Sequence, residues 1–247
     1  MNDKIKNEQI FHDNRFADGL GYRVQEKYYK AVSHAYDYVN SLINKLSSNG
    51  GIALEYGCST GDNLKILLDK FELYVVGIDI STRAIEMAQI NLSKFKNTSE
   101  IYVMDANAPN FIDGKFDFCF GRGILHHLEW TKCIVQLRRI LRSEGSFVFI
   151  EPLGTNPLIN FYRYLTPGDR SPDELPLNKF HLDFLKLIFP SVTFKFYGFL
   201  TLFLFNLNER SSSFKFLFNL TCKLDSIIFK LPFLWRLAWI VVIEGKK

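Results

Sequence analysis

The hydrophobic pattern of the chain changes its period near residue 50. Before that point, residues 28–46 repeat apolar positions at helical spacing, and the following SSNGG marks a helix end. From residue 51 onward, short apolar runs rich in β-branched and aromatic residues alternate with amphipathic helical patterns. Nearly continuous apolar strands separated by helices are typical of a parallel sheet covered on both faces. The pattern predicts a doubly wound, mostly parallel α/β sheet.

The expected elements fill residues 51–155 in strict alternation. Strands are expected over 51–57, 73–81, 100–106, 116–123 and 146–153, with helical patterns over 62–71, 82–95 and 129–145. Beyond residue 155 the alternation fails. Residues 152–180 hold five of the eight prolines and indicate an insertion, whereas 181–189 is expected to be a helix and 192–197 and 237–244 to be strands.

Three regions follow from this pattern. We expect an N-terminal helical cap over 1–50, in which the helix at 28–46 closes over a ligand, and an α/β core over 51–155. Residues 156–247 are expected to form the C-terminal half of the same domain, with insertions at 156–180 and 200–236 and the last two strands.

Charge and apolar residues concentrate in the C-terminal part of the chain. Residues 191–247 carry a net charge of +5 and 10 of the 24 phenylalanines, but their longest uncharged run, 196–208, is shorter than the ~20 residues of a membrane-spanning helix. The basic, Phe-rich segment 200–236 therefore predicts an apolar acceptor pocket, a peripheral contact with an anionic membrane, or plain core. Four scattered cysteines and a polar N-terminus predict a cytoplasmic protein without a structural zinc site. If the segment 200–236 contacts a membrane, we expect the protein at the inner membrane face.

The most informative motif lies between the first expected strand and helix, at Leu54–Asn63. A strand that enters a glycine-containing turn and then a helix lets backbone N–H groups approach a ligand closely. A dinucleotide G-x-G-x-x-G would need glycines where the chain has Ser59 and Asp62. A hydrolase nucleophile elbow would use Ser59, but a single strand precedes it and no H-G-G-G segment lies upstream.

The third interpretation is a resemblance to class I S-adenosylmethionine-dependent methyltransferases. Glu55-x-Gly57-x-Ser59-x-Gly61 resembles that family's E/D-x-G-x-G-x-G loop, with Ser59 at the middle glycine. The resemblance implies that Asp79, at the end of the second strand, accepts the ribose hydroxyls and that Asp105, after the third, contacts adenine. The S-adenosyl-L-methionine residues it implies are Glu55, Gly57, Cys58, Ser59, Gly61, Asp79, Ile80, Asp105, Ala106 and Gly121.

Later segments resemble one subgroup of this family. Phe116–Phe118, Gly123–Leu128 and 137–150 are similar to methyltransferases of ubiquinone and menaquinone biosynthesis. The resemblance implies a seven-stranded Rossmann-like sheet with an antiparallel last strand. Gly57 and Gly61 could still be simple turn glycines and Asp79 a helix cap, in which case this edge binds no cofactor.

Motifs that the chain lacks exclude several classes of methyl acceptor. The chain lacks N/D-P-P-Y/F after the fourth strand, a Pro-Cys pair, an acidic metal cluster and a nucleic-acid-sized basic patch. We therefore expect metal-independent methylation of a small molecule, most simply at a hydroxyl or acidic oxygen of a sugar-like, surface-polysaccharide or secondary-metabolite precursor. C-methylation of a quinone-like or lipid-like acceptor and a non-catalytic nucleoside-binding protein remain alternatives.

Candidate bases and acceptor contacts follow the fourth and fifth strands. A hydroxyl acceptor must lose a proton, and His126, His127, Glu151 and His181 are the candidate acceptors of that proton. Tyr162 and Arg163 in the first insertion are candidate clamps for an anionic or sugar-like acceptor, or part of a solvated loop. The sequence predicts no nucleic-acid partner and leaves the oligomeric state open.

Overall fold

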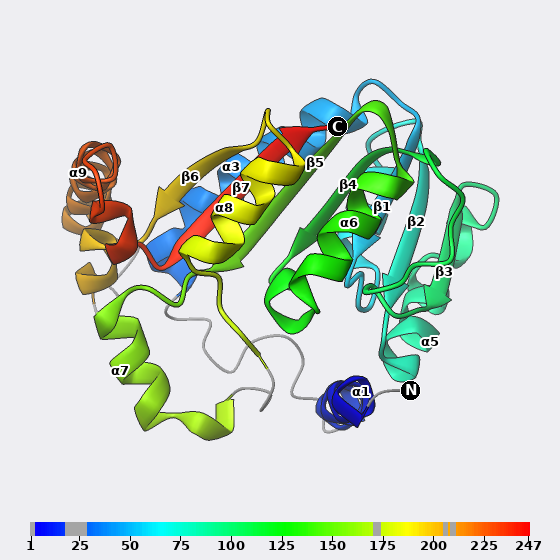
Figure 1. The fold of residues 1–247 in the computed structure, drawn as a ribbon, viewed down its shortest axis with the longest axis horizontal. Coiled ribbons are helices and arrows are strands. Elements are labelled where there is room, and N and C mark those ends of the chain that lie inside the picture. The colour runs from blue at the N-terminus through cyan, green and yellow to red at the C-terminus, as the bar shows by residue number, and fades with distance from the viewer. Residues whose placement is uncertain (1–2, 18–28, 170–173, 205–206, 208–210) are drawn as a thin grey trace.

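The computed structural model describes residues 3–17, 29–169, 174–204, 207 and 211–247. Its centre is a seven-stranded sheet in the order β3-β2-β1-β4-β5-β7-β6 (Figure 1). The strands are Ile52–Tyr56 (β1), Tyr74–Asp79 (β2), Ser99–Val103 (β3), Phe116–Arg122 (β4), Leu141–Pro152 (β5), Thr193–Tyr197 (β6) and Ile240–Lys246 (β7). Strands β1 to β5 pair in parallel, and β7 runs antiparallel to both β5 and β6. The predicted sheet class and antiparallel last strand are confirmed.

Helices cover both faces of this sheet. They are Asp3–Ala17 (α1), Ser33–Ser47 (α3), Asp62–Leu68 (α4), Thr82–Asn91 (α5), Trp130–Ile140 (α6), Pro157–Leu165 (α7), Lys179–Ile188 (α8) and Ser212–Ile228 (α9). Short 3-10 turns lie at Lys30–Val32 (η1), Ser93–Phe95 (η2), Leu125–His127 (η3), Pro167–Asp169 (η4), Leu200–Leu204 (η5) and Leu234–Leu237 (η6). None of the helices in the described ranges is long and apolar enough to cross a membrane.

Alternating side chains of the strands feed two separate cores. Phe147 and Phe149 of β5 pack with α6 and α8 on one face, and Val148 and Ile150 pack with α3 and α4 on the other. Both sets are buried, which explains why the strand sequences are almost continuously apolar.

The sheet order reverses between β1 and β4, and this reversal positions the site. The chain leaves β1 toward β2 and leaves β4 toward β5, so their following loops diverge at the carboxyl edge. Ligands of doubly wound sheets bind in the crevice that such a switch point creates. The loops after β1, β2, β3, β4 and β5 all meet at this carboxyl edge.

Several element boundaries differ from the predictions. The third strand ends at Val103, so Asp105 already lies in a loop. The helix expected over 129–145 ends at Ile140, because Leu141 is buried beside Phe116 and starts β5, which contains a shift of register and Glu144 at φ +62°. The last strand begins at Ile240, preceded by η6.

The expected cap and insertions also differ in form. Helix α3 does not close over the carboxyl edge, because Val39 and Ile43 pack on the sheet face beside β5 and β7. Helix α1 takes that place and packs against α5. The two insertions contain helices α7 and α9, which the sequence pattern does not predict. Strands β6 and β7 complete the same sheet as the core strands.

Candidate active site

The turn after β1 is a left-handed loop that ends at the start of α4. Gly57, Ser59 and Gly61 have φ of +67°, +49° and +76°. A Cβ atom at Gly57 or Gly61 would lie 3.1 Å from a side-chain carbon of Ile124 or Leu92, so a side chain at either position would be crowded as well as conformationally strained. Ser59 adopts a conformation that costs an L-residue about 1–2 kcal/mol. Although Ser59 replaces the middle glycine of the motif, it keeps the left-handed backbone conformation, so the loop keeps its shape.

Glu55 is a buried acid at the base of this loop. Its Oε1 accepts a hydrogen bond of 2.7 Å from Asn63 Nδ2, whereas Oε2 is buried without a hydrogen-bond partner among the described residues. Burial raises the pKa of Glu55 to about 8, and the charge of Arg122 opposes that rise. The side chain is therefore largely protonated at neutral pH, and a cation bound nearby would favour its ionised form.

Asp79 connects the second strand to the loop. Its Oδ2 accepts from the backbone N–H of Ser59 and its Oδ1 from that of Ser81, each at 2.9 Å. Burial is the main influence on its carboxyl and raises the pKa, against these hydrogen bonds. The N-cap of α5 is Ser81, whose hydroxyl accepts from Ala84. Asp79 is thus not the helix cap that the sequence left possible.

Of the remaining predicted cofactor residues, some lie at the carboxyl edge of the sheet and others are packed beneath the loop. Asp105 Oδ1 accepts from the backbone and side-chain amide of Asn107 at 2.8 and 2.9 Å, which fixes the loop after β3. Ala106 is buried and Ile80 half-buried at the same edge. In contrast, Cys58 packs against Gly77 of β2, and a side chain at Gly121 would collide with Ile124 and Phe149. The last two residues serve packing beneath the loop.

Glu151 and His126 form a buried dyad at the end of β5 and in η3. Glu151 Oε1 accepts from the backbone N–H groups of Ile124 and Leu125, both at 2.9 Å, and Oε2 pairs with His126 Nδ1 at 2.7 Å. Glu151 is fully buried and His126 is 8% exposed. An ionised Glu151 requires the proton of His126 on Nδ1, which leaves the lone pair on Nε2. That Nε2 lies 3.9 Å from Oε2 of Glu174, beyond hydrogen-bond distance.

Comparison with known proteins places this geometry in a family. Residues 54–149, which run from β1 into β5 and include the loop, match the family model described as a methyltransferase domain. This stretch carries Glu55, Asp79 and Asp105 at the ends of three successive strands. Residues 54–149 form a methyltransferase domain.

Two relatives match this chain over about half of its length. An uncharacterised protein of Methanocaldococcus jannaschii is 31% identical over 135 residues, which cover 50% of each chain. Phosphoethanolamine N-methyltransferase 1 of Arabidopsis thaliana is 23% identical over 51% of this chain and 28% of its own length. The matches thus span half or less of these relatives.

A solved structure shows the same fold over most of the chain. The geranyl diphosphate C-methyltransferase of Streptomyces coelicolor A3(2), in complex with Mg²⁺, geranyl diphosphate and S-adenosyl-L-homocysteine, superposes with a TM-score of 0.59. It is 11% identical and covers 92% of this chain and 86% of its own. The predicted cofactor is S-adenosylmethionine, and it is confirmed at the level of the methyltransferase fold. The neighbour with this fold was solved with S-adenosyl-L-homocysteine, the demethylated product of that cofactor. The ubiquinone and menaquinone subgroup stays a prediction.

Helix α1 brings residues to the methyltransferase edge that the sequence did not reveal. His127 Nδ1 lies 3.4 Å from Glu8 Oε1, and His12 Nε2 lies 3.4 Å from Glu8 Oε2. Asp13 Oδ1 accepts from the Ser81 hydroxyl at 2.6 Å, next to Asp79. Burial lowers the pKa of His127. Of the two adjacent histidines, His126 thus pairs with Glu151, and His127 contacts Glu8 of α1.

His181 has a structural contact that explains its presence. Its Nδ1 accepts from the backbone N–H of Asn178 at 3.0 Å, as part of the capping box that starts α8. Its ring packs edge-on against Trp130, with centroids 4.7 Å apart. Burial lowers the pKa of His181. These contacts commit Nδ1 of His181 to a helix end.

The two acceptor candidates lie on α7. An Arg163 nitrogen donates to the carbonyl of Leu153 at 3.0 Å and lies 3.3 Å from Oδ1 of Asn160. The Tyr162 carbonyl accepts from the Thr166 hydroxyl at 3.0 Å. Both side chains are half-buried. Arg163 therefore helps to fix the chain that leaves the carboxyl end of β5.

Two groups of this edge have the ligand types of a divalent metal site. They are Glu8, His12 and His127, and His126, His127 and Glu174, with the possible ligand atoms of each group within 4.8 Å of one another. Neither group is visible in the sequence, because Glu8, His12 and Glu174 lie far along the chain from the two histidines. Metal-independence therefore stays a prediction.

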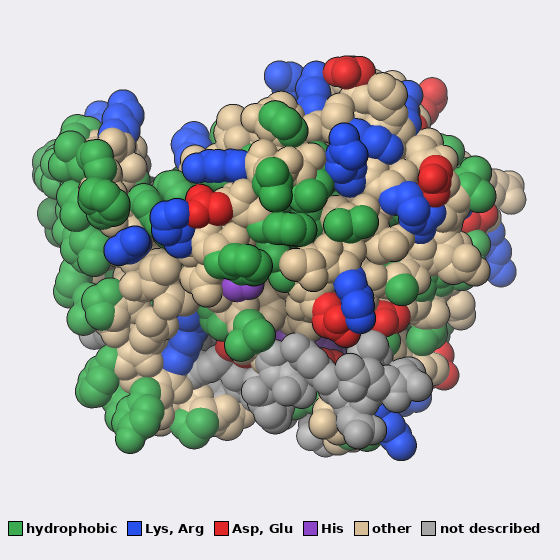
Figure 2. All heavy atoms as spheres, viewed as in Figure 1, with side chains coloured by type: hydrophobic (Ala, Val, Ile, Leu, Met, Phe, Trp, Pro, Cys, Tyr) green, Lys and Arg blue, Asp and Glu red, His purple; other side chains and the backbone are tan. Residues whose placement is uncertain are grey.

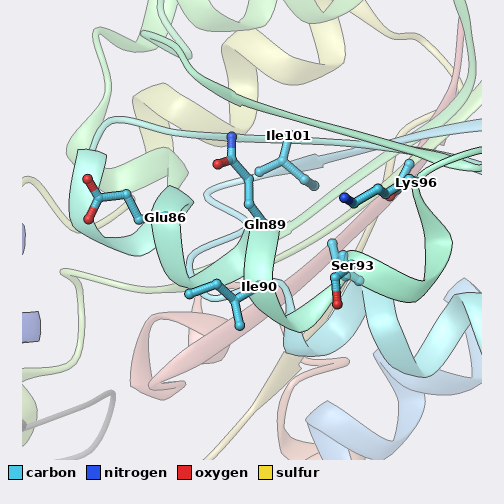
Figure 3. A pocket seen from close by; sticks show the side chains of 8 residues that line it. Glu86, Gln89, Ile90, Ser93, Lys96 and Ile101 are labelled. Atoms are coloured by element: carbon cyan, nitrogen blue, oxygen red, sulfur yellow. The ribbon is translucent and has the colours of Figure 1, made fainter.

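The surface hollow drawn in Figure 3 is not the candidate site. It has a volume of about 580 Å³ and lies between α5, η2 and β3, with Gln89, Ile90 and Ile101 in its lining. It contains none of the predicted site residues. The chemical groups gather instead at the carboxyl edge of the sheet.

Proposed function

We propose that this protein transfers a methyl group from S-adenosylmethionine to a hydroxyl or acidic oxygen of a small molecule. The observation that carries the proposal is the Glu151–His126 dyad, which lies beside the methyltransferase loop at the switch point. A buried carboxylate that holds one ring nitrogen of a histidine leaves the other nitrogen as a proton acceptor. A hydroxyl nucleophile needs such a group.

The residues at the edge fit the proposed donor. Three buried polar atoms here lack a hydrogen-bond partner within the described ranges: Glu55 Oε2, Ser59 Oγ and Arg122 Nε. A bound polar ligand supplies such partners, because an unpaired buried polar atom otherwise costs about 1–3 kcal/mol. Glu55 and the loop would hold the amino-acid part of the donor, Asp79 its ribose and the Asp105–Ala106 segment its adenine. When bound, the donor supplies an electrophilic methyl group on a sulfonium.

The dyad gives the chain a route for the acceptor proton. His126 Nε2 would take the proton from the acceptor hydroxyl as the acceptor oxygen bonds to the methyl carbon and the bond between that carbon and the donor sulfur breaks, which leaves S-adenosylhomocysteine. The imidazolium is then stabilised by the carboxylate of Glu151, whose other oxygen is held by two backbone N–H bonds. Burial of both side chains limits the access of water to this proton transfer.

The relatives support a small acceptor of variable chemistry. Phosphoethanolamine N-methyltransferase and geranyl diphosphate C-methyltransferase are named for small phosphorylated acceptors. Arg163, at the start of the first insertion, is suited to an anionic or sugar-like acceptor and remains our candidate for that contact, with Tyr162 beside it. We favour oxygen methylation over a non-catalytic nucleoside-binding protein, because the latter gives no specific role to a paired histidine. C-methylation of a quinone-like acceptor also releases a proton and is the alternative reaction at this site.

The test is turnover of S-adenosylmethionine against a panel of hydroxylated sugars, phenols and organic acids. We expect at least one acceptor to release S-adenosylhomocysteine, with kcat about 10²-fold lower in His126→Ala and Glu151→Gln. Donor binding should be unchanged in both variants. His127→Ala is the matched control, since it removes a neighbouring histidine that is paired with Glu8. Equal kcat values for the wild type, His126→Ala and Glu151→Gln would disprove the role of the dyad.

A further inference from the structure

Helix α9 exposes an apolar stripe that no described element covers. Phe216, Leu217, Leu220, Leu224 and Ile227 occupy positions i, i+1, i+4, i+8 and i+11, which lie on one side of a helix. All five are exposed, with Phe216 at 69% and Ile227 at 59%. Five large apolar side chains in a row on one 17-residue helix are unusual on a surface that faces only water.

This stripe is not the face that attaches α9 to the protein. The opposite side carries Phe214, which is buried and stacks on Phe218, and Phe218 packs edge-on against His34. Buried Asp225 accepts from the backbone N–H of Leu200 at 2.8 Å and so ties the helix to η5. Helix α9 thus already has a packed inner face, and its exposed stripe is additional.

Helix α7 and the segment after α9 extend the apolar surface. Leu158, Phe161, Tyr164 and Leu165 repeat at helical spacing on α7, and Tyr164 is 81% exposed. Phe233, beyond the end of α9, is 68% exposed. Figure 2 shows hydrophobic side chains gathered along the edge of the molecule formed by α9 and again over α7.

The charges around the stripe have one sign. Lys215, Lys223, Lys230 and Arg236 are exposed on or after α9. Lys223 and Lys230 border the apolar stripe, seven residues apart. The only acid within residues 211–236 is Asp225, which is buried and hydrogen-bonded. Apolar side chains bordered by lysines are typical of a helix that lies in the plane of an anionic membrane surface.

We propose that α9 and α7 dock this protein on the surface of an anionic lipid bilayer. The apolar stripe enters the boundary between headgroups and acyl chains while the lysines contact lipid phosphates. Charge favours this occupant over a second copy of the chain, because a symmetric dimer through α9 would bring lysines of both copies together. The docking is independent of the methyl-transfer chemistry, although α7 begins shortly after Glu151 and so adjoins the catalytic edge.

The test is co-sedimentation of the full chain with lipid vesicles. One vesicle contains phosphatidylcholine alone and the other also contains about 30% phosphatidylglycerol, whose charge attracts each nearby lysine by about 1 kcal/mol, or about fivefold in affinity. We expect at least tenfold stronger partitioning to the anionic vesicle. Lys223→Gln/Lys230→Gln should lose about 10–30-fold of that binding, and high salt should weaken it in the wild type.

Apolar insertion is tested separately from charge. Phe216→Gln/Leu220→Gln should weaken binding at least tenfold, because two exposed apolar side chains no longer enter the bilayer. Ile112→Gln/Leu187→Gln, two equally apolar residues that are 75% exposed elsewhere, should leave partitioning and the unfolding midpoint unchanged. No partitioning to either vesicle would overturn the proposal. So would a solution dimer that Phe216→Gln/Leu220→Gln dissociates, or equal partitioning of that variant and the wild type.

Discussion

Glu55 makes the binding of the donor depend on pH in a way that can be calculated. Its pKa of about 8 in the free protein arises from burial, and its Oε2 lacks a hydrogen-bond partner within the described structure. S-adenosylmethionine carries positive charge, so binding next to Glu55 should favour the carboxylate and release a proton. The perturbation is Glu55→Gln, which keeps the shape of the side chain and cannot ionise.

The expected magnitude follows from the ionised fraction. With a pKa of about 8, this fraction is roughly 1% at pH 6 and 24% at pH 7.5, so the wild-type Kd should fall roughly 25-fold over that range. At pH 7 about 0.9 proton should be released per donor bound. The donor's own amino group also begins to titrate below pH 7.5, because its pKa is near 8, and Glu55→Gln reports that contribution separately. The Kd of Glu55→Gln should be nearly constant.

The assay is isothermal titration calorimetry in two buffers of different ionisation enthalpy, which gives Kd and the number of protons released. Asp69→Asn, which removes an exposed carboxylate at the C-terminal end of α4, is the control and should behave as the wild type. The same variants give a second readout. Because folded Glu55 holds its proton between its ordinary pKa of 4.5 and about 8, the free energy of unfolding should fall as pH rises through that window, and less so in Glu55→Gln. Equal proton release by the wild type and Glu55→Gln would refute the reasoning.

Three further predictions concern the same edge. Asp79→Ala should weaken donor binding by about 1.5–3 kcal/mol, measured by titration, whereas an unchanged Kd would remove Asp79 from the ribose site. Ser59→Gly should raise the free energy of unfolding of the ligand-free protein by about 1 kcal/mol, measured by denaturant titration. The reason is that glycine relieves the left-handed strain and removes a buried hydroxyl without a hydrogen-bond partner in the described structure. A destabilised variant would contradict this. Chelation by EDTA should leave turnover unchanged, and a loss that Mg²⁺ or Zn²⁺ restores would instead assign a metal to His126, His127 and Glu174.

The sheet and the loop were predictable because their signals are local. Each parallel strand is buried on both faces, so the β1, β2 and β4 sequences are apolar almost throughout. The carboxyl ends of parallel strands share an edge, which is why the order of the strands along the chain predicts that Glu55, Asp79 and Asp105 lie together. The strand β5 was misjudged at its start, since 137–145 has helical spacing although Leu141 pairs with Phe116.

The missed parts depend on contacts between distant segments. Glu8, His12 and Asp13 join the site only because α1 packs on α5, and the short polar sequence of α1 carries no motif. Glu174 lies in a segment without periodicity. His181 could not be distinguished from a base, because the capping box that occupies it is visible only in the geometry of Asn178.

Helix α9 was missed for a different physical reason. Its apolar residues lie on the packed inner face, with Phe214 and Phe218, and also on the exposed stripe with Phe216 and Leu220. Apolar positions on two sides of a helix conceal the 3.6-residue period that identifies an amphipathic helix. The sequence shows that this segment is rich in phenylalanine. It does not show that the apolar side chains lie on two different faces of one helix.

The most direct test of the central claim is thermal unfolding of the protein with S-adenosylmethionine, S-adenosylhomocysteine, NAD or no ligand. At a hundredfold excess over Kd, binding adds about 2.7 kcal/mol and should raise the midpoint by roughly 5–10 °C for a chain of this size. We predict that both sulfur nucleosides raise the midpoint and that NAD does not. If neither sulfur nucleoside raises it, then Glu55, Asp79 and Asp105 do not form a donor site and the proposed methyl transfer is wrong.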